Sequence, residues 1–445
     1  MTVSLFDSAI YRDLLSDHDT ATLFGDAAEL RALLDTEAAL ARAQAAVGVI
    51  PTHAAAAITK AAHALTIDPD SLRSGTALAG VPIPALLTAL RTASGEFASY
   101  VHWGVTSQDI VDTALILRLK TASDILEQRL SRLARLLVKQ ADEHRLTVMA
   151  GRTRFQQAVP ITYGLKAAGW LSALCRHRVR LTQLRERAFV AQLGGAAGTL
   201  AALGSDGADV RTAFARELGL ATCPIPWHTQ RDGITEFAGW LSLVSATLGK
   251  IGGDLLLLAQ SEVGEVRLAA GGGSSAMPQK ANPVAAEILV ALARANAGYL
   301  STMHGAMLQE HERSGSGWTV EWLTLPQMVV AAGAGLARAC DLMQGLYVDR
   351  ARMRSAVDAT RGLIMAEAAC IALSATMPRM EAEKLVAQAC TEVSAGKKHL
   401  ADELSALVTP PFDAEALRDP TTYLGASETF IDAVLAEAAS VFPAD

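Results

Sequence analysis

Residues 271–283 read GGGSSAMPQKANP and place hydroxyl, ammonium and amide groups on a stretch with little tendency to form a helix or a strand. Its glycines permit backbone conformations closed to other residues, so backbone N–H groups can point at a ligand. Lys280 adds a fixed positive charge, and Asn282 stands where the next helix begins, so the helix N-terminus would face the same ligand. The pattern predicts a mobile anion-binding loop; a flexible Gly/Ser connection between two helices is the alternative.

A second candidate is the stretch HWGVTSQD at residues 102–109. Thr106 or Ser107 can cap a following helix, because serine and threonine hydroxyls accept hydrogen bonds from the free N–H groups of a helix N-terminus. The remaining N–H groups then form an anion site that hydroxyls can complete. Helix capping without any ligand is the alternative reading of this stretch.

Taken together, these stretches resemble a known family. GSSAMPQKANP is similar to the signature loop GSSxMPxKxNP of the fumarase/aspartase superfamily, and two further stretches, at 102–114 and 151–170, match that superfamily in the expected order. The resemblance covers nearly the whole chain. It implies a mostly helical three-domain subunit, a homotetramer whose central helices form one bundle, and active sites that are each assembled from three subunits. In the superfamily the stretch at 102–109 binds a substrate carboxylate.

The stretch GRTRFQQA departs from that pattern in an informative way. The lyases of the superfamily typically carry a histidine after RT, linked to the leaving group, whereas this chain has Arg154. A departing amine or hydroxide needs a proton, and loss of a positioned general acid costs about 10²- to 10⁴-fold in rate. A carboxylate needs none, since its pKa lies at about 4. The substitution therefore favours a reaction in which a carboxylate is the nucleophile, a cycloisomerisation that closes a lactone.

Four other stretches are more similar to the lactone-forming branch of the superfamily than to its purine lyases: PWHTQRD at 226–232, QLGGAAGTLAALG at 192–204, QEHERSGSGW at 309–318 and DATRGLIMAEA at 358–368. Each alone fits ordinary packing, and a single histidine such as His228 is more often structural than catalytic. In that branch we expect tryptophan in place of Arg154 and histidine in place of Gln157. An added guanidinium would suit a more strongly anionic substituent, such as a sulfonate on the diene.

The resemblance also assigns roles to residues. Ser274 would transfer a proton at carbon, while Lys280 and Asn282 would stabilise the negative charge that develops on a substrate carboxylate, each donor contributing about 10²- to 10³-fold. The residues expected to bind the polycarboxylate substrate are His102, Thr106, Ser107, Arg152, Arg154, Gln156, Ser275, Met277 and Arg313. For each arginine, a salt bridge to a bundle glutamate is the alternative. No metal and no cofactor is expected.

The composition predicts an all-α fold. Of 445 residues, 51% are hydrophobic but only 5% are aromatic, with alanine and leucine spread throughout. A net charge of −7 argues against nucleic acid or an anionic membrane as a partner. The five cysteines lack metal-like spacing and indicate reduced thiols in a cytoplasmic protein. The N-terminal segment has acids early and no apolar core, which excludes a secretory signal.

Three long helices are predicted from apolar spacing: residues 107 to about 144, 233 to about 258, and 284 to about 309. The most apolar stretch, near 238–260, contains Lys250 and Asp254, which indicates a buried helix rather than a membrane span. Helices apolar on several sides need several neighbours, so we expect a homo-oligomer. The predicted division is an N-terminal helical domain (1–106), a central long-helix bundle (107–355) and a C-terminal helical domain (356–445).

Two other functions remain open at this stage. The first is a true lyase that releases fumarate from adenylosuccinate or argininosuccinate, against which the missing histidine counts. The second is a non-catalytic structural member of the superfamily, for which a charged mobile loop would have no use.

Overall fold

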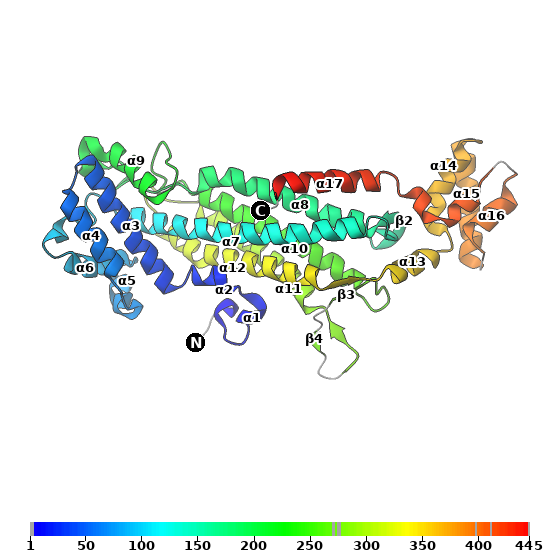
Figure 1. Cartoon of the computed structure of the whole chain (residues 1–445), viewed down its shortest axis with the longest axis horizontal. Coiled ribbons are helices and arrows are strands. Elements are labelled where there is room, and N and C mark those ends of the chain that lie inside the picture. The colour runs from blue at the N-terminus through cyan, green and yellow to red at the C-terminus, as the bar shows by residue number, and fades with distance from the viewer. Residues whose placement is uncertain (1–3, 269–271, 274–276, 397, 410–411, 444–445) are drawn as a thin grey trace. The chain divides into compact units, whose positions relative to one another are not determined.

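The computed structural model describes residues 4–268, 272–273, 277–396, 398–409 and 412–443. Regular structure in this part of the chain is almost entirely helical (Figure 1), which confirms the all-α class. The α-helices are α1 Arg12–Leu15, α2 His18–Thr22, α3 Asp26–Val47, α4 Thr52–Ala64, α5 Arg73–Ala79, α6 Ile83–Ser94, α7 Ser107–Glu143, α8 Tyr163–Ala188, α9 Gly207–Leu218, α10 Asp232–Leu258, α11 Val284–Ala306, α12 Ser316–Gln344, α13 Arg350–Asp358, α14 Ala366–Ser374, α15 Arg379–Ala395, α16 Leu400–Leu407 and α17 Ser427–Val441. Short 3₁₀ helices lie at Leu5–Asp7, Pro69–Leu72, Gly95–Tyr100, Ala201–Asp206, Leu363–Met365, Glu415–Arg418 and Pro420–Tyr423.

The strands form three antiparallel pairs. They are β1 Val148–Thr153 with β2 Gln156–Thr162, β3 Val266–Leu268 with β6 Leu346–Val348, and β4 Gly272–Gly273 with β5 Ala281–Asn282. The last pair corrects the expectation that residues 271–283 are poor strand formers throughout. A two-residue ribbon closes the base of that loop.

Two compact units share the chain. The first unit consists of Met1–Arg129, His177–Ala246 and Ala291–Ala337, and the second of Leu130–Arg176, Thr247–Val290 and Arg338–Asp445. The five longest helices of the described residues each contribute to both units, namely α7, α8, α10, α11 and α12. The predicted division into three domains at residues 106 and 355 stays a prediction.

In the first unit, the helices α3, α4, α6 and α9 pack around one apolar core that includes Leu33, Leu40 and Phe214. Two of these helices start at prolines: α4 begins directly after Pro51 and α6 directly after Pro82. This position suits proline, because the first N–H groups of a helix have no partner within it.

The three predicted long helices are confirmed as α7, α10 and α11. Sequence patterning missed α8 and α12, the latter because it contains Pro326 in its interior. Within the described residues α10 and α12 are long and apolar enough to cross a membrane, a test that core helices also pass.

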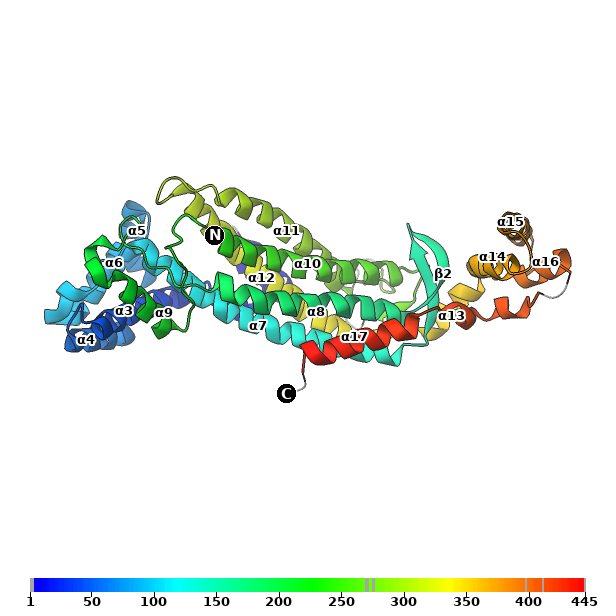
Figure 2. The same cartoon turned by 90° about the horizontal axis from the view of Figure 1, so that it is seen from above.

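In the second unit, α14, α15 and α16 pack in sequence around a small core of their own (Figures 1 and 2). The hairpin β1–β2 contacts α13 and contributes Val148 and Ala150 to that core. The opposite end of this hairpin is the turn at Arg154 and Phe155.

Candidate functional site

Asp109, in the first turn of α7, organises the part of the site that lies in the first unit. Its carboxylate is fully buried and takes four contacts: Oδ1 accepts from the Gly194 N–H at 2.8 Å and lies 2.8 Å from His228 Nε2, and Oδ2 accepts from the Gly195 N–H at 2.9 Å and the Thr106 N–H at 3.0 Å. One carboxylate thus fixes both the cap of α7 and the glycine-rich turn. His228 is accordingly a buried structural partner.

Arg313 approaches the same place from outside. Its Nη1 donates to Thr106 Oγ1 at 2.7 Å, and its Nη2 donates to the carbonyl oxygens of Gly195 and Ala196 at 3.2 and 3.0 Å. Two expected site residues are therefore in contact. The Thr106 hydroxyl accepts from this guanidinium rather than from a helix N–H, and the Asp109 carboxylate accepts the Thr106 backbone N–H, which is the reciprocal hydrogen bond of a capping box. Ser107 begins α7 beside them and is half-buried.

His102, the third expected residue of this stretch, has a left-handed backbone with a φ of 62°. Its Nδ1 lies 2.6 Å from Oε1 of Glu37, a carboxylate on α3 that is only 1% exposed. Two helical turns further along α3, Gln44 Nε2 donates to the Trp103 carbonyl oxygen at 2.6 Å. Helix α3 therefore holds the turn before α7 through two buried polar side chains.

A buried charge cluster lies one helical turn along α7. Arg231 is fully enclosed and donates to both carboxylate oxygens of Asp112, at 2.6 and 3.0 Å, and to both oxygens of Glu321, at 2.8 and 2.5 Å. The Trp318 indole also donates to Asp112, at 2.9 Å. Burial raises the pKa of Glu321 although the Arg231 guanidinium opposes this. The cluster fastens α12 to the first two turns of α7.

In the second unit, the hairpin β1–β2 carries the next group of expected residues. Its tip is the pair Arg154 and Phe155, both left-handed with φ values of 51° and 65°. Two consecutive residues with positive φ form the type I′ turn typical of two-residue hairpins, which normally uses asparagine and glycine. Arg154 is exposed, as is Phe155 at 81%. Gln156 follows as the first residue of β2, also exposed and opposite Thr153.

Arg152 has a different environment from Arg154. Its guanidinium forms two parallel hydrogen bonds with Glu265, at 2.8 and 2.7 Å, and Glu265 is fully buried. This is the ion-pair alternative considered for each arginine, although Glu265 lies just before β3 rather than on a bundle helix. The ion pair and a hydrogen bond to the Ala150 carbonyl at 3.4 Å occupy only part of the five N–H donors of this guanidinium, so substrate binding by Arg152 stays a prediction.

The loop between β4 and β5 carries the remaining residues. Gly272 pairs with Asn282 and Gly273 with Ala281, and the Lys280 N–H donates to the Met277 carbonyl at 3.0 Å to close a turn. The side chain of Lys280 is exposed, and α11 begins two residues after Asn282.

Ser274 and Ser275, the expected proton donor and its neighbour, lie outside the described residues. Met277 is 43% exposed.

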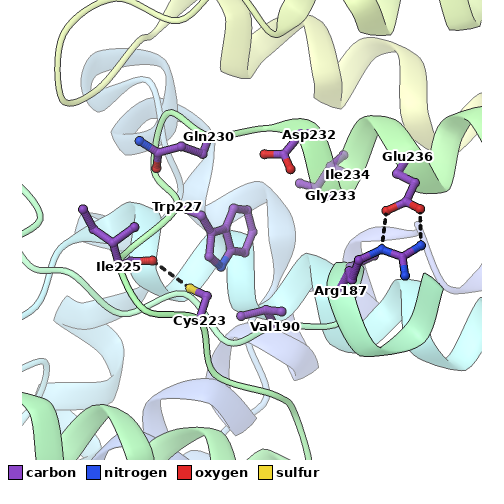
Figure 3. A pocket seen from close by; sticks show the side chains of 11 residues that line it. Arg187, Val190, Cys223, Ile225, Trp227, Gln230, Asp232, Gly233, Ile234 and Glu236 are labelled. Atoms are coloured by element: carbon purple, nitrogen blue, oxygen red, sulfur yellow. Dashed lines mark hydrogen bonds and ion pairs between the residues drawn. The ribbon is translucent and has the colours of Figure 1, made fainter. Parts of the chain in front are cut away.

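Two cavities in the described part of the chain are candidate ligand sites. One, of about 210 Å³ in the first unit, is lined by Arg187, Ala188, Val190, Cys223, Ile225, Trp227, Gln230, Asp232, Gly233, Ile234 and Glu236 (Figure 3). Its one cation, Arg187, is paired with Glu236. None of the expected site residues is among those that line it.

The other cavity, of about 430 Å³ in the second unit, is lined by Ala150, Arg152, Arg154, Phe155, Lys166, Lys250, Asp254, Leu257, Leu258, Gln260 and Val263. It contains two of the expected substrate-binding residues together with two lysines. Its size falls in the range typical of small-molecule pockets.

Sequence reasoning missed Glu37, Glu265, Arg231, Glu321 and Lys166. Four of them act through contacts with distant residues, and no local pattern in the sequence marks those contacts. Lys166 lies within residues 151–170, one of the stretches that resemble the superfamily, and this position could have marked it as a candidate.

Comparison with known proteins defines the class first. Residues 20–297 match the model of a family described as lyase, and the chain belongs to this family. This confirms the resemblance to the fumarase/aspartase superfamily.

Individual relatives carry names of particular activities, which are narrower than the family description. The chain is 46% identical, over 93% of its own length and 93% of the relative's, to 3-carboxy-cis,cis-muconate cycloisomerase of Pseudomonas aeruginosa. The crystal structure of the 3-carboxy-cis,cis-muconate lactonizing enzyme from Pseudomonas putida superposes with a TM-score of 0.91 at 41% identity, covering 98% of this chain and all of that one. A nitrosuccinate lyase of Streptomyces davaonensis is 39% identical over 96% of this chain and 94% of its own.

Proposed function

We propose that this protein is a cycloisomerase that closes 3-carboxy-cis,cis-muconate, or a close analogue such as 3-sulfomuconate, to a muconolactone. The observation that carries the proposal is Arg154 at the tip of the hairpin, where the lyases of the superfamily have a histidine. A residue that cannot donate a proton at neutral pH suits a reaction without a basic leaving group. The cycloisomerases among the relatives support the same reading.

In the proposed reaction, a carboxylate oxygen of the substrate adds to the conjugated double bond and a C–O bond forms. The electron pair of that double bond moves onto a second carboxylate, and a proton delivered to the neighbouring carbon completes the lactone, so that no atom leaves. Ser274 would deliver that proton. Lys280 and Asn282 would stabilise the developing negative charge from the loop, each by about 3–4 kcal/mol.

The remaining expected residues would hold the carboxylates. Thr106 and Ser107 at the N-terminus of α7, with Arg313 beside them, offer hydroxyl, N–H and guanidinium donors to one carboxylate. Arg154 and Gln156 would serve another from the hairpin. His102, Ser275 and Met277 complete the proposed pocket.

We also propose the assembly that the superfamily implies. It is a cytoplasmic homotetramer of three-domain subunits, in which each active site combines the α7 turn, the hairpin and the 271–283 loop from three subunits. The exposed hairpin tip and the exposed Lys280 support this, because catalytic side chains on single-chain surfaces need partners to enclose a substrate.

A lyase is the second candidate, since a nitrosuccinate lyase is among the relatives. An elimination whose leaving group is a weak base needs no acid either, so Arg154 does not disfavour it.

The test is the loss of ultraviolet absorbance when purified protein meets freshly made 3-carboxy-cis,cis-muconate. The 3-sulfo analogue, adenylosuccinate and nitrosuccinate are run alongside, with Ser274→Ala as the control variant. Rapid bleaching that depends on Ser274 supports the cycloisomerase. Fumarate released from adenylosuccinate or nitrosuccinate, without bleaching of either diene, would replace it with the lyase.

A further inference from the structure

The cavity of about 430 Å³ in the second unit holds one cation whose role is unassigned, Lys166. This lysine lies in the first turn of α8, a helix that begins directly after Thr162. The Thr162 hydroxyl accepts the Leu165 N–H at 3.0 Å and so fixes the start of the helix. The side chain is half-buried, and burial lowers the pKa of Lys166 although Asp254 opposes this. A partly desolvated ammonium group is costly to the fold unless an anion compensates it.

The anions near Lys166 are already engaged. Asp254 pairs with Lys250, four residues earlier on α10, and its other oxygen accepts from the Trp170 indole at 2.9 Å. Glu265 gives both of its oxygens to Arg152. Each of these two carboxylates therefore has a cationic partner of its own, and together they form two neutral pairs.

Two cations are left over, Lys166 and Arg154. Within residues 4–268 and the other described ranges, neither has an ion-pair partner or a hydrogen bond. The cavity thus carries an excess of two positive charges. Phe155, Leu257 and Leu258 add apolar lining to the same cavity. Two cations beside an apolar wall fit a ligand with two or more carboxylates on a short carbon skeleton.

We infer that Lys166, together with Arg154, binds the carboxylates of a di- or tricarboxylate ligand in this cavity, whereas the charge of Arg152 is already balanced by Glu265. The inference rests on the proposed function for the identity of that ligand as the substrate. It assigns to Lys166 a substrate-positioning role, with its charge acting on the bound polycarboxylate.

Binding can be measured without turnover by isothermal calorimetry with tricarballylate, a saturated tricarboxylate that cannot lactonise. We expect Lys166→Met to weaken tricarballylate binding about tenfold or more, because a charge-assisted contact is lost. Lys166→Arg keeps the charge and should recover most of the affinity. Lys384→Met, an exposed lysine on α15, is the matched control and should bind as the unchanged protein does.

Thermal unfolding followed by circular dichroism checks that the variants fold. Equal tricarballylate affinity in Lys166→Met and the unchanged protein, with equal melting temperatures, would overturn the inference. An equal loss of affinity in Lys166→Arg would overturn it as well, since a purely structural lysine would behave in that way.

Kinetics separates this inference from the proposed function. If the protein bleaches 3-carboxymuconate, Lys166→Met should raise KM about tenfold with a smaller change in kcat; unchanged KM would overturn the role of Lys166 alone. If the protein bleaches neither diene but tricarballylate binding still depends on Lys166, the cycloisomerase proposal fails and the binding site stands.

Discussion

Replacing Asp109 with asparagine tests the arrangement on which the α7 turn depends. The carboxylate of Asp109 is fully buried and receives the N–H groups of Thr106, Gly194 and Gly195 as well as His228 Nε2. An asparagine side chain has one acceptor oxygen and one amide nitrogen that can only donate. If the amide nitrogen takes the place of Oδ2, the N–H groups of Thr106 and Gly195 both lose their acceptor. If it takes the place of Oδ1, the Gly194 N–H loses its acceptor, whereas His228 Nε2 can accept from the amide in its other tautomer.

The magnitude follows from those contacts. A buried donor left without an acceptor costs about 1–3 kcal/mol in the free energy of unfolding. Since the amide can adopt the orientation that leaves only the Gly194 N–H without an acceptor, we expect a loss of about 1–3 kcal/mol for Asp109→Asn. The control is Asp35→Asn on α3, where the carboxylate is 44% exposed and pairs with Arg31 four residues earlier. An exposed pair of this kind contributes about 0.3–0.5 kcal/mol.

Equilibrium unfolding in urea, followed by circular dichroism at one protein concentration, measures both variants. A loss below about 1 kcal/mol for Asp109→Asn, or a loss no larger than that of Asp35→Asn, would refute the four-contact description. Carboxylate binding by the α7 turn should fall with stability, because the same side chain holds Thr106 in place.

Three further predictions concern single side chains. Burial raises the pKa of Glu321 in the folded protein, so the protonated side chain stabilises the fold at pH values below its ordinary pKa of about 4.5, and this stabilisation is lost as the pH rises through the raised pKa. In Glu321→Gln the unfolding free energy should therefore fall less steeply with rising pH. An unchanged slope between pH 4 and 8 would contradict the prediction. Glu37→Gln should lower kcat/KM for 3-carboxymuconate about ten- to hundredfold, because the hydrogen bond between a carboxylate and the His102 ring is worth about 1.5–3 kcal/mol; equal kcat/KM values would count against a role for that turn. Arg154→Trp should reduce turnover of the 3-sulfo diene more than that of the 3-carboxy diene, and the ratio of the two kcat/KM values checks this, an unchanged ratio being the contrary result.

Much of the fold could be predicted from the sequence, because apolar spacing is a local property. The starts of α7, α10 and α11 were predicted to within one residue. The ends of α7 and α10 were predicted equally well, whereas α11 ends at Ala306 rather than near residue 309. Helix α12 was missed because its interior proline, Pro326, is a local signal for a break that tertiary packing overrides.

The site was predictable only where the motif itself carries the chemistry. Lys280 and Asn282 stand at fixed offsets in one loop, whereas the contact between Thr106 and Arg313 joins residues 207 positions apart. Nothing in the spacing around Arg152 reveals that Glu265 neutralises it, although the ion pair was one of two readings held open. Three of the four contacts of Asp109 are likewise tertiary, and only its hydrogen bond with the Thr106 N–H is local.

The left-handed tip of the hairpin sets a limit on how this protein can be stabilised. A non-glycine residue with positive φ costs about 1 kcal/mol or more, and the tip has two of them in succession, Arg154 and Phe155. Asparagine and glycine at these positions would remove the backbone strain of the turn and raise the melting temperature. Such a variant would also lose the guanidinium and the ring that line the cavity. A library of variants selected only for survival at high temperature would therefore enrich hairpins that fold better and no longer distinguish one anionic diene from another.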